Sequence, residues 1–128
     1  MNTLLVFARF PRLGRVKSRL AGTVGEQFAF DLYCAMLQDT LERYRRMADR
    51  RFLYLAECDC EEGLTLVRNW GMGAEYEVAL QAEGDLGERM WHAVSEVREV
   101  SGRVVIVGSD SPTVPLGYVQ QAFDRLGD

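Results

Sequence analysis

The fold is decided near the amino end by the stretch Leu4-Leu5-Val6-Phe7-Ala8-Arg9-Phe10-Pro11-Arg12-Leu13-Gly14-Arg15-Val16-Lys17-Ser18-Arg19-Leu20. Its apolar start predicts a buried strand over Thr3–Ala8, and its second half is a cation-rich loop that leads into a helical pattern over residues 25–48. Ligands of open α/β sheets lie outside the carboxyl ends of the strands. A basic loop directly after a strand therefore indicates a site for an anionic, phosphate-rich small molecule.

The charge of the chain is unevenly distributed. Its 128 residues carry a net charge of −4, yet the first 25 contain five cations and no acid. Nucleic-acid-binding domains are basic over a whole face, so one local group of cations in an acidic chain argues against a nucleic-acid partner. No apolar run approaches the ~18 residues of a membrane span, and an odd number of cysteines, three, fits a reducing compartment. We expect a cytoplasmic protein without a membrane partner.

Strand-like runs alternate with helical patterns along the chain. After the first strand and helix, we expect strands over residues 52–57, 75–81 and 103–107, helices over 61–70 and 86–100, and a last helix lined by Leu116, Val119, Ala122, Phe123 and Leu126. Such alternation implies right-handed crossovers and a sheet covered on both sides. The expected fold class is α/β, a three-layer α/β/α domain with a mainly parallel sheet over residues 1–128.

Apolar spacing also predicts which side chains are buried. In the long helix, Phe28, Leu32, Met36 and Thr40 recur at four-residue steps, beside Tyr33, Leu37, Leu41 and Tyr44. The third helix should bury Met90, Ala93, Val94 and Val97. Trp70 and Trp91 are expected in the core or at its rim. The fourth strand, being β-branched and almost entirely apolar, should be buried on both faces.

The first loop holds the main candidates for phosphate binding. Pro11 and Gly14 favour an irregular path that exposes backbone N–H groups, which can bind phosphate together with the cations Arg9, Arg12, Arg15, Lys17 and Arg19. Lys17 is the only lysine of the chain, and a compact ammonium suits contact with phosphate oxygens. The spacings of a P-loop and of a dinucleotide-binding fingerprint are both absent. The alternative is a solvated basic loop without a ligand.

Two further loops should open on the same edge of the sheet. After the fourth strand comes Asp110, within a Gly-Ser-Asp-Ser-Pro turn. Mg²⁺ commonly takes one or two protein carboxylates together with substrate phosphates, which makes Asp110 a metal candidate, with plain turn formation as the alternative. After the third strand, Gly84, Asp85 and Gly87 would let a base or ribose approach the backbone, although Asp85 and Glu88 also have the spacing of a capping box.

Other chemistries find little support. His92, the only histidine, falls on the polar side of its predicted helix and is expected to be solvated, which argues against Ser-His and Cys-His nucleophilic schemes. Cys58 and Cys60 lack the paired spacing of a structural zinc site. The pattern leaves open whether Arg89 points inward or into solvent.

Four motifs together resemble the DUF2064 group. They are, in chain order, Phe7-Ala8-Arg9-x-Pro11-x-x-Gly14-x-Val16-Lys17-Ser18-Arg19-Leu20, Asp39-Thr40, Gly84-Asp85-Leu86-Gly87-Glu88-Arg89-Met90 and Gly108-Ser109-Asp110-Ser111-Pro112. The group is glycosyltransferase-like, is often described as nucleotide-diphospho-sugar transferases, and is related in fold to the GT-A enzymes and to nucleotidyltransferases such as phospholactate guanylyltransferase. Arg9 and Ser18 stand where lysine and threonine are common in the group.

The resemblance implies a nucleotidyl- or glycosyltransferase that uses Mg²⁺ or Mn²⁺ and binds a nucleoside triphosphate or a nucleotide-diphospho-sugar. It implies that the first loop, from Ala8 onward, binds the nucleotide phosphates, that Lys17 and Arg19 act catalytically there, and that Asp110 holds the metal. Members of the group continue into a further strand and an acceptor segment that this sequence does not reach. The resemblance therefore leaves two explanations of the length: a fragment truncated after the fourth β-α unit, or a short form that pairs with another copy, which covers the open sheet edge in a homo-oligomer. The alternative function is a non-catalytic nucleotide-binding or interaction half-domain that needs a partner chain.

Overall fold

The computed structural model describes residues 2–13, 25–98 and 102–108. Its elements are the strands β1 (Asn2–Arg9), β2 (Arg50–Ala56), β3 (Glu77–Leu80) and β4 (Arg103–Gly108) and the helices α2 (Glu26–Tyr44), α3 (Cys60–Asn69) and α4 (Leu86–Arg98). All four predicted strands and the first three predicted helices are confirmed, with bounds that differ by a few residues. The predicted helix that contains Leu116 lies outside the described residues.

The four strands form one parallel sheet in the order β3-β2-β1-β4. Val6 of β1 lies opposite Leu53 of β2 on one side and Val107 of β4 on the other. Because every pair is parallel, all four strands end at the same edge, which we call the carboxyl edge. The chain adds β2 and β3 on one side of β1 and then returns to add β4 on the other side. The strand order therefore reverses between β1 and β4, which is the topological switch point of an open α/β sheet.

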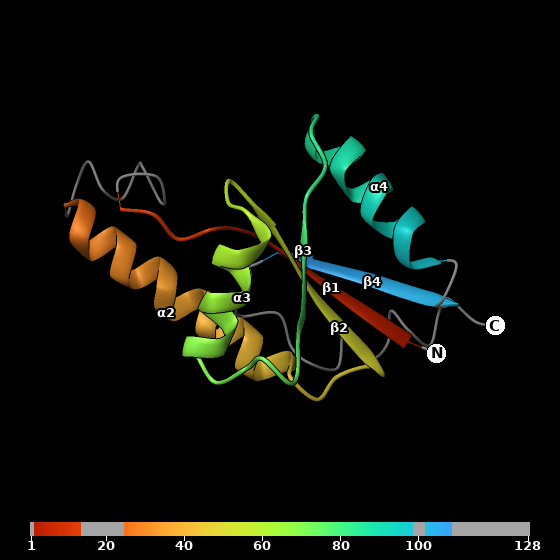
Figure 1. Cartoon of the computed structure of the whole chain (residues 1–128), viewed down its shortest axis with the longest axis horizontal. Coiled ribbons are helices and arrows are strands. Elements are labelled where there is room, and N and C mark those ends of the chain that lie inside the picture. Colours follow the sequence, from red (N-terminus) through yellow and green to blue (C-terminus); the bar gives the residue numbers. More distant parts are fainter. Residues whose placement is uncertain (1, 14–24, 99–101, 109–128) are drawn as a thin grey trace.

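Helices cover both faces of the sheet, as the alternation of elements predicts. Figure 1 shows α2 and α3 on one side of the sheet and α4 on the other. Side chains alternate along β1, so Leu4 and Val6 pack with α2 and α3, whereas Leu5 and Phe7 pack with α4. The described residues thus form the expected three-layer α/β/α domain.

Some expected core positions are wrong. Phe28 is 56% exposed and Trp91 is 67% exposed, because the stripe that α2 buries runs instead through Ala29, Tyr33, Leu37, Thr40, Leu41 and Tyr44, and the stripe of α4 through Ala93 and Val97. The β4 residues are half-buried along the whole strand rather than buried on both faces. Met90 and Val94 pack at the margin of the α4 core, as expected.

Local signals explain the ends of α3. Asp59 caps its first turn in a capping box with Glu62, since each side chain accepts a hydrogen bond from the other residue's backbone N–H. At the other end Gly71 has a φ of +73°, and the N–H of Met72 donates to the carbonyl of Val67 at 2.8 Å. This pattern is a Schellman motif, so the predicted stop at Gly71 is confirmed. None of the helices in the described ranges is long and apolar enough to cross a membrane.

Candidate functional site

The first loop begins from a fixed position at the carboxyl edge. The Tyr33 hydroxyl of α2 accepts a hydrogen bond from the Arg9 N–H at 3.0 Å and donates to the Arg9 carbonyl at 2.7 Å. The N–H of Phe10 donates to the carbonyl of Ala56 at 3.0 Å, which extends the pairing of β1 with β2. Helix α2 and strand β2 together therefore set the direction in which the basic loop leaves the sheet.

The cation that ends β1 and the first cation of the loop form ion pairs with acids that follow β2. Arg9 Nε lies 2.9 Å from Glu57 Oε2. Arg12 Nη2 contacts both carboxylate oxygens of Glu62, at 3.0 and 2.9 Å, and the Arg12 guanidinium also donates to the Glu57 carbonyl and lies over the Phe10 ring. A phosphate bound by Arg9 would compete with its ion pair. The two side chains of that pair are 56% and 41% exposed, so we expect the pair to contribute less than about 1 kcal/mol to the free energy of unfolding. A multivalent anion should therefore displace Glu57 from Arg9.

Glu57 adopts a backbone conformation that is uncommon for a residue other than glycine. Its φ is +66°, a left-handed value in which the side chain crowds the backbone. Both ends of the residue contact the basic loop, the carboxylate through Arg9 and the carbonyl through Arg12. Such strain persists where surrounding contacts hold it, and here those contacts come from the predicted phosphate-binding loop.

The loop after β3 shows the capping box that its spacing allows. Asp85 Oδ1 accepts a hydrogen bond from the Glu88 N–H at 2.8 Å, and Glu88 Oε1 lies 3.4 Å from the Asp85 N–H. The pKa of Asp85 is lowered, first by this backbone hydrogen bond. Gly84 has a φ of +120°, and a Cβ there would stand 3.0 Å from the Glu88 carboxylate, whereas Gly87 has ordinary space. A sugar-binding role for these residues stays a prediction, because helix capping alone explains Asp85.

Gln81 is a residue of this edge that the sequence pattern did not single out. It directly follows β3, and its side-chain Nε2 donates to the carbonyls of Ala8 and Tyr54, at 3.1 and 3.0 Å. Its Oε1 accepts a hydrogen bond from Arg89 Nη1 at 2.8 Å. One amide thus links the ends of β1 and β2 to a cation of α4. The sequence shows a glutamine at a strand end and gives no signal for these contacts.

The remaining predicted site residues divide into two groups. Ala8 and Pro11 are buried, the Ala8 carbonyl already accepts a hydrogen bond from Gln81, and Pro11 has no N–H to donate to a phosphate. Gly14, Arg15, Lys17, Arg19 and Asp110 lie outside the described residues. The described strands bring the two predicted segments to one edge: Gly108, the last residue of β4, pairs with Phe7 of β1. The chain therefore enters the basic loop and the Asp110 turn from neighbouring strands.

The described ranges contain neither a metal-binding cluster nor a thiol activated by a lowered pKa. No group of three or more His, Cys, Asp or Glu side chains in residues 2–13, 25–98 and 102–108 could hold a metal ion. Burial, with a smaller contribution from Glu62, raises the pKa of Cys58 to about 11, which keeps its thiol protonated at neutral pH. His92 is exposed, as predicted, and its ring lies against the Trp91 ring.

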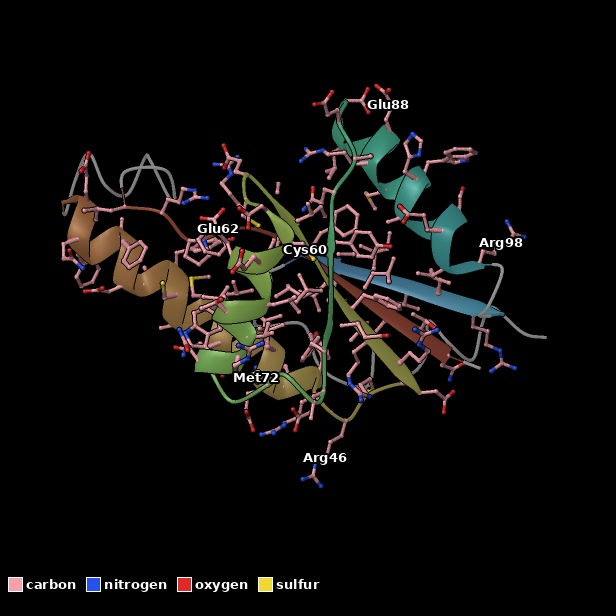
Figure 2. All side chains as sticks on the ribbon, in the orientation of Figure 1. Arg46, Cys60, Glu62, Met72, Glu88 and Arg98 are labelled. Carbon is pink, nitrogen blue, oxygen red and sulfur yellow. The ribbon has the colours of Figure 1, made fainter. Side chains whose placement is uncertain are left out.

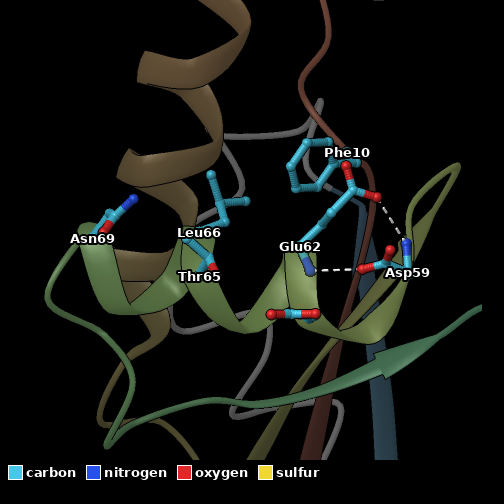
Figure 3. A pocket seen from close by; sticks show the side chains of 7 residues that line it. Phe10, Asp59, Glu62, Thr65, Leu66 and Asn69 are labelled. Atoms are coloured by element: carbon cyan, nitrogen blue, oxygen red, sulfur yellow. Dashed lines mark hydrogen bonds between the residues drawn. The ribbon is translucent and has the colours of Figure 1, made fainter.

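A cavity of about 390 Å³ lies beside α3 (Figure 3). None of the residues that line it is one of the predicted ligand-binding residues. Its lining consists of Phe10, Asp59, Glu61, Glu62, Thr65, Leu66 and Asn69. Three of these side chains are acidic and none is basic. The pKa of Glu62 is lowered by its backbone hydrogen bond at Asp59 and then by Arg12, so its carboxylate is ionised. A nucleotide phosphate would be repelled from this cavity, which therefore does not compete with the carboxyl edge as an anion site.

The fold and sequence relate the chain to known proteins. A crystal structure from Desulfovibrio desulfuricans G20, described as a "putative nucleotide-diphospho-sugar transferase", is 33% identical and superimposes with a TM-score of 0.84. The match covers 96% of this chain and 53% of that one, so the chain spans about half the length of its neighbour. None of the curated proteins matches the chain. The family model described as "Uncharacterized protein conserved in bacteria (DUF2064)" matches residues 42–128, more than half of the sequence. The chain belongs to the DUF2064 family.

Proposed function

We propose that this chain is the nucleotide-binding part of a Mg²⁺- or Mn²⁺-dependent nucleotidyl- or glycosyltransferase, with a nucleoside triphosphate or a nucleotide-diphospho-sugar as substrate. The strand order carries the proposal. β1 and β4 are neighbours at the switch point, the basic loop follows β1, and Asp110 comes two residues after β4. Ligands of open α/β sheets bind at this place. The likeness to a structure described as a nucleotide-diphospho-sugar transferase supports the substrate class.

The predicted residues take separate roles in this scheme. Lys17 and Arg19 neutralise the phosphates. The backbone N–H groups of residues 12–14 are the donors to phosphate oxygens, because those of Arg9 and Phe10 already have partners and Pro11 has none. Asp110 is the protein ligand of the metal, and a single carboxylate suits Mg²⁺, which takes its other ligands from water and phosphate. When bound, the metal would neutralise charge that develops on the leaving phosphate. Gly84 and Asp85 border the base or ribose.

The first test is nucleotide binding by the full chain. Isothermal titration with Mg²⁺-GTP and Mg²⁺-UDP-glucose should give saturable binding to the wild type. Lys17→Ala should weaken it by about tenfold or more, since a hydrogen bond to a charged group is lost. Arg46→Ala is the matched control and should stay within about twofold. Arg46 is exposed and projects from the fold near the amino ends of the strands, where Asp49 contacts Asn2 (Figure 2).

Equal effects of the two substitutions would show that the basic loop is solvated surface without a ligand. Asp110→Asn should remove the dependence of binding on Mg²⁺ and leave metal-free nucleotide binding unchanged. A second measurement separates enzyme from binding module: release of pyrophosphate or nucleoside diphosphate across a panel of acceptors supports the transferase. Mg²⁺-dependent binding without any turnover supports the half-domain that needs a partner chain, an alternative consistent with the half-length match to the neighbour.

A further inference from the structure

The side chain of Gln81 can take only one orientation. Its amide group faces two carbonyl oxygens, of Ala8 and Tyr54, so the end that points to the strands must be the NH₂ donor. A flipped amide would place an oxygen against two oxygens. The Oε1 atom must therefore point away from the strands and needs a donor, which Arg89 Nη1 supplies at 2.8 Å. The backbone N–H of Gln81 also donates to the Leu55 carbonyl at 2.9 Å, so the residue is anchored at both ends.

Arg89 has fewer close partners than three other half-buried arginines of the described ranges. Arg45 and Arg50 each contact a carboxylate directly, and Arg51 donates to three backbone carbonyl oxygens. Arg89 contacts no carboxylate within residues 2–13, 25–98 and 102–108: its Nη1 donates to Gln81, its Nε lies a long 3.4 Å from the Asp85 carbonyl, and its Nη2 makes no hydrogen bond there. The nearby Asp85 carboxylate is already bound to the Glu88 N–H. A half-buried guanidinium with a single short hydrogen bond to the described residues has further hydrogen-bonding capacity and a full positive charge.

We propose that Arg89 anchors an oxyanion subsite at the carboxyl edge and that Gln81 is its positioning residue. The ligand group is a phosphate or a carboxylate, whose oxygens match the planar donors of a guanidinium. Gln81 links Arg89 to the Ala8 carbonyl, one residue before the end of β1, and so places the cation beside the strand from which the basic loop departs. Only the identity of the physiological ligand rests on the proposed function. That ligand is expected to be a group of the nucleotide substrate or of its acceptor.

The test uses the full chain, labelled with ¹⁵N-arginine, and two simple anions as probes. Inorganic pyrophosphate represents the phosphates of a nucleotide, and malonate represents the carboxylates of an acceptor. In the wild type, one of them should shift the Arg89 Nε–H resonance saturably and more strongly than the other, which identifies the source of the group. Arg89→Lys keeps the charge but loses the planar fork, and should weaken affinity for that anion by about tenfold.

Arg98→Lys is the control, because Arg98 is an exposed cation at the far end of the same helix from Glu88 (Figure 2). Its affinity for the anion should match the wild type. Gln81→Leu tests positioning: the charge stays, but the Arg89 resonance should narrow as the side chain gains motion, and affinity should fall. Urea denaturation midpoints show whether each variant is folded. If Gln81→Leu does not fold, Arg89→Lys alone tests the anion subsite.

The outcomes separate this subsite from the proposed function. If neither anion shifts the Arg89 resonance, or if Arg89→Lys binds the anion and Mg²⁺-GTP as the wild type does, the subsite is refuted, and nucleotide binding by the wild type would still support the transferase. If pyrophosphate or malonate shifts Arg89 while no nucleotide binds, the subsite stands and the proposed function fails.

Discussion

Helix α3 touches the sheet at Gly63, and the substitution Gly63→Ala measures how tightly it packs there. Gly63 is buried, and a methyl group added to it would lie 2.7 Å from Val78 Cγ1 and 2.9 Å from Leu55 Cδ1. Carbon atoms in contact normally stand about 3.5–4.0 Å apart. Leu55 is fully buried and Val78 is β-branched, with few rotamers to choose from, so neither side chain can move away easily.

Two opposing terms set the expected size of the effect. Alanine in place of glycine inside a helix favours folding by about 1 kcal/mol. Overpacking of a core costs about 1–3 kcal/mol, and two contacts below 3.0 Å place Gly63 in the upper part of that range. We therefore expect Gly63→Ala to lower the free energy of unfolding by about 1–2 kcal/mol.

Urea denaturation followed by circular dichroism at pH 7 measures this difference. Gly87→Ala is the matched control, because a methyl group there would meet only Asp85 Oδ1, at 3.4 Å; its stability should stay the same or rise by up to about 1 kcal/mol. The double variant Gly63→Ala, Val78→Ala should lose less free energy of unfolding than the two single variants lose together, because alanine at position 78 leaves room for the added methyl group. A Gly63→Ala variant more stable than the wild type would refute the close packing of α3 on β3.

Three further outcomes follow from the site. Tyr33→Phe removes two hydrogen bonds to the backbone of Arg9 and should lower the free energy of unfolding by about 1–3 kcal/mol, measured in urea; an unchanged midpoint would show that the hydroxyl does not hold the loop. The folded-state pKa of Glu62 lies below its ordinary value of 4.5, so its ionised form stabilises the fold above pH 4.5 and that contribution is lost as the pH falls through the lowered value. The stability difference between wild type and Glu62→Gln should accordingly be largest near pH 7 and shrink as the pH falls through the lowered pKa, whereas a pH-independent difference would contradict the ion-pair explanation. In iodoacetamide labelling at pH 8, the exposed Cys60 should react well before the half-buried Cys58, whose pKa is raised to about 11; equal rates would contradict that raised pKa.

Much of the fold could be read from local patterns. The apolar runs of β1 and β4 and the four-residue spacing in α2 predict their elements because a buried strand and an amphipathic helix each leave a periodic trace in the sequence. The same reasoning erred at Phe28 and Trp91, which continue an apolar spacing yet lie outside the buried stripe. Periodicity names a candidate face, but only the position of the sheet decides how wide the buried stripe is.

The candidate site was less accessible to such reasoning. The capping box at Asp85 was visible as a spacing, and the basic loop as a local excess of cations. The ion pair of Arg12 with Glu62, 50 residues away, was not visible. Nor was the bond of Gln81 to the Ala8 carbonyl, which spans 73 residues. Such partners leave no local pattern, because each is a common residue type whose role depends on what it meets in space.

The sequence by itself determined that this is an α/β chain with a cluster of positive charge directly after its first strand. Only the tertiary structure decided that β4 returns to pair with β1, so that the strand order reverses where the basic loop departs. The physical reason is that helix and strand formation depend on neighbours a few residues apart, whereas strand order depends on which buried surfaces pack together once the helices cover the sheet.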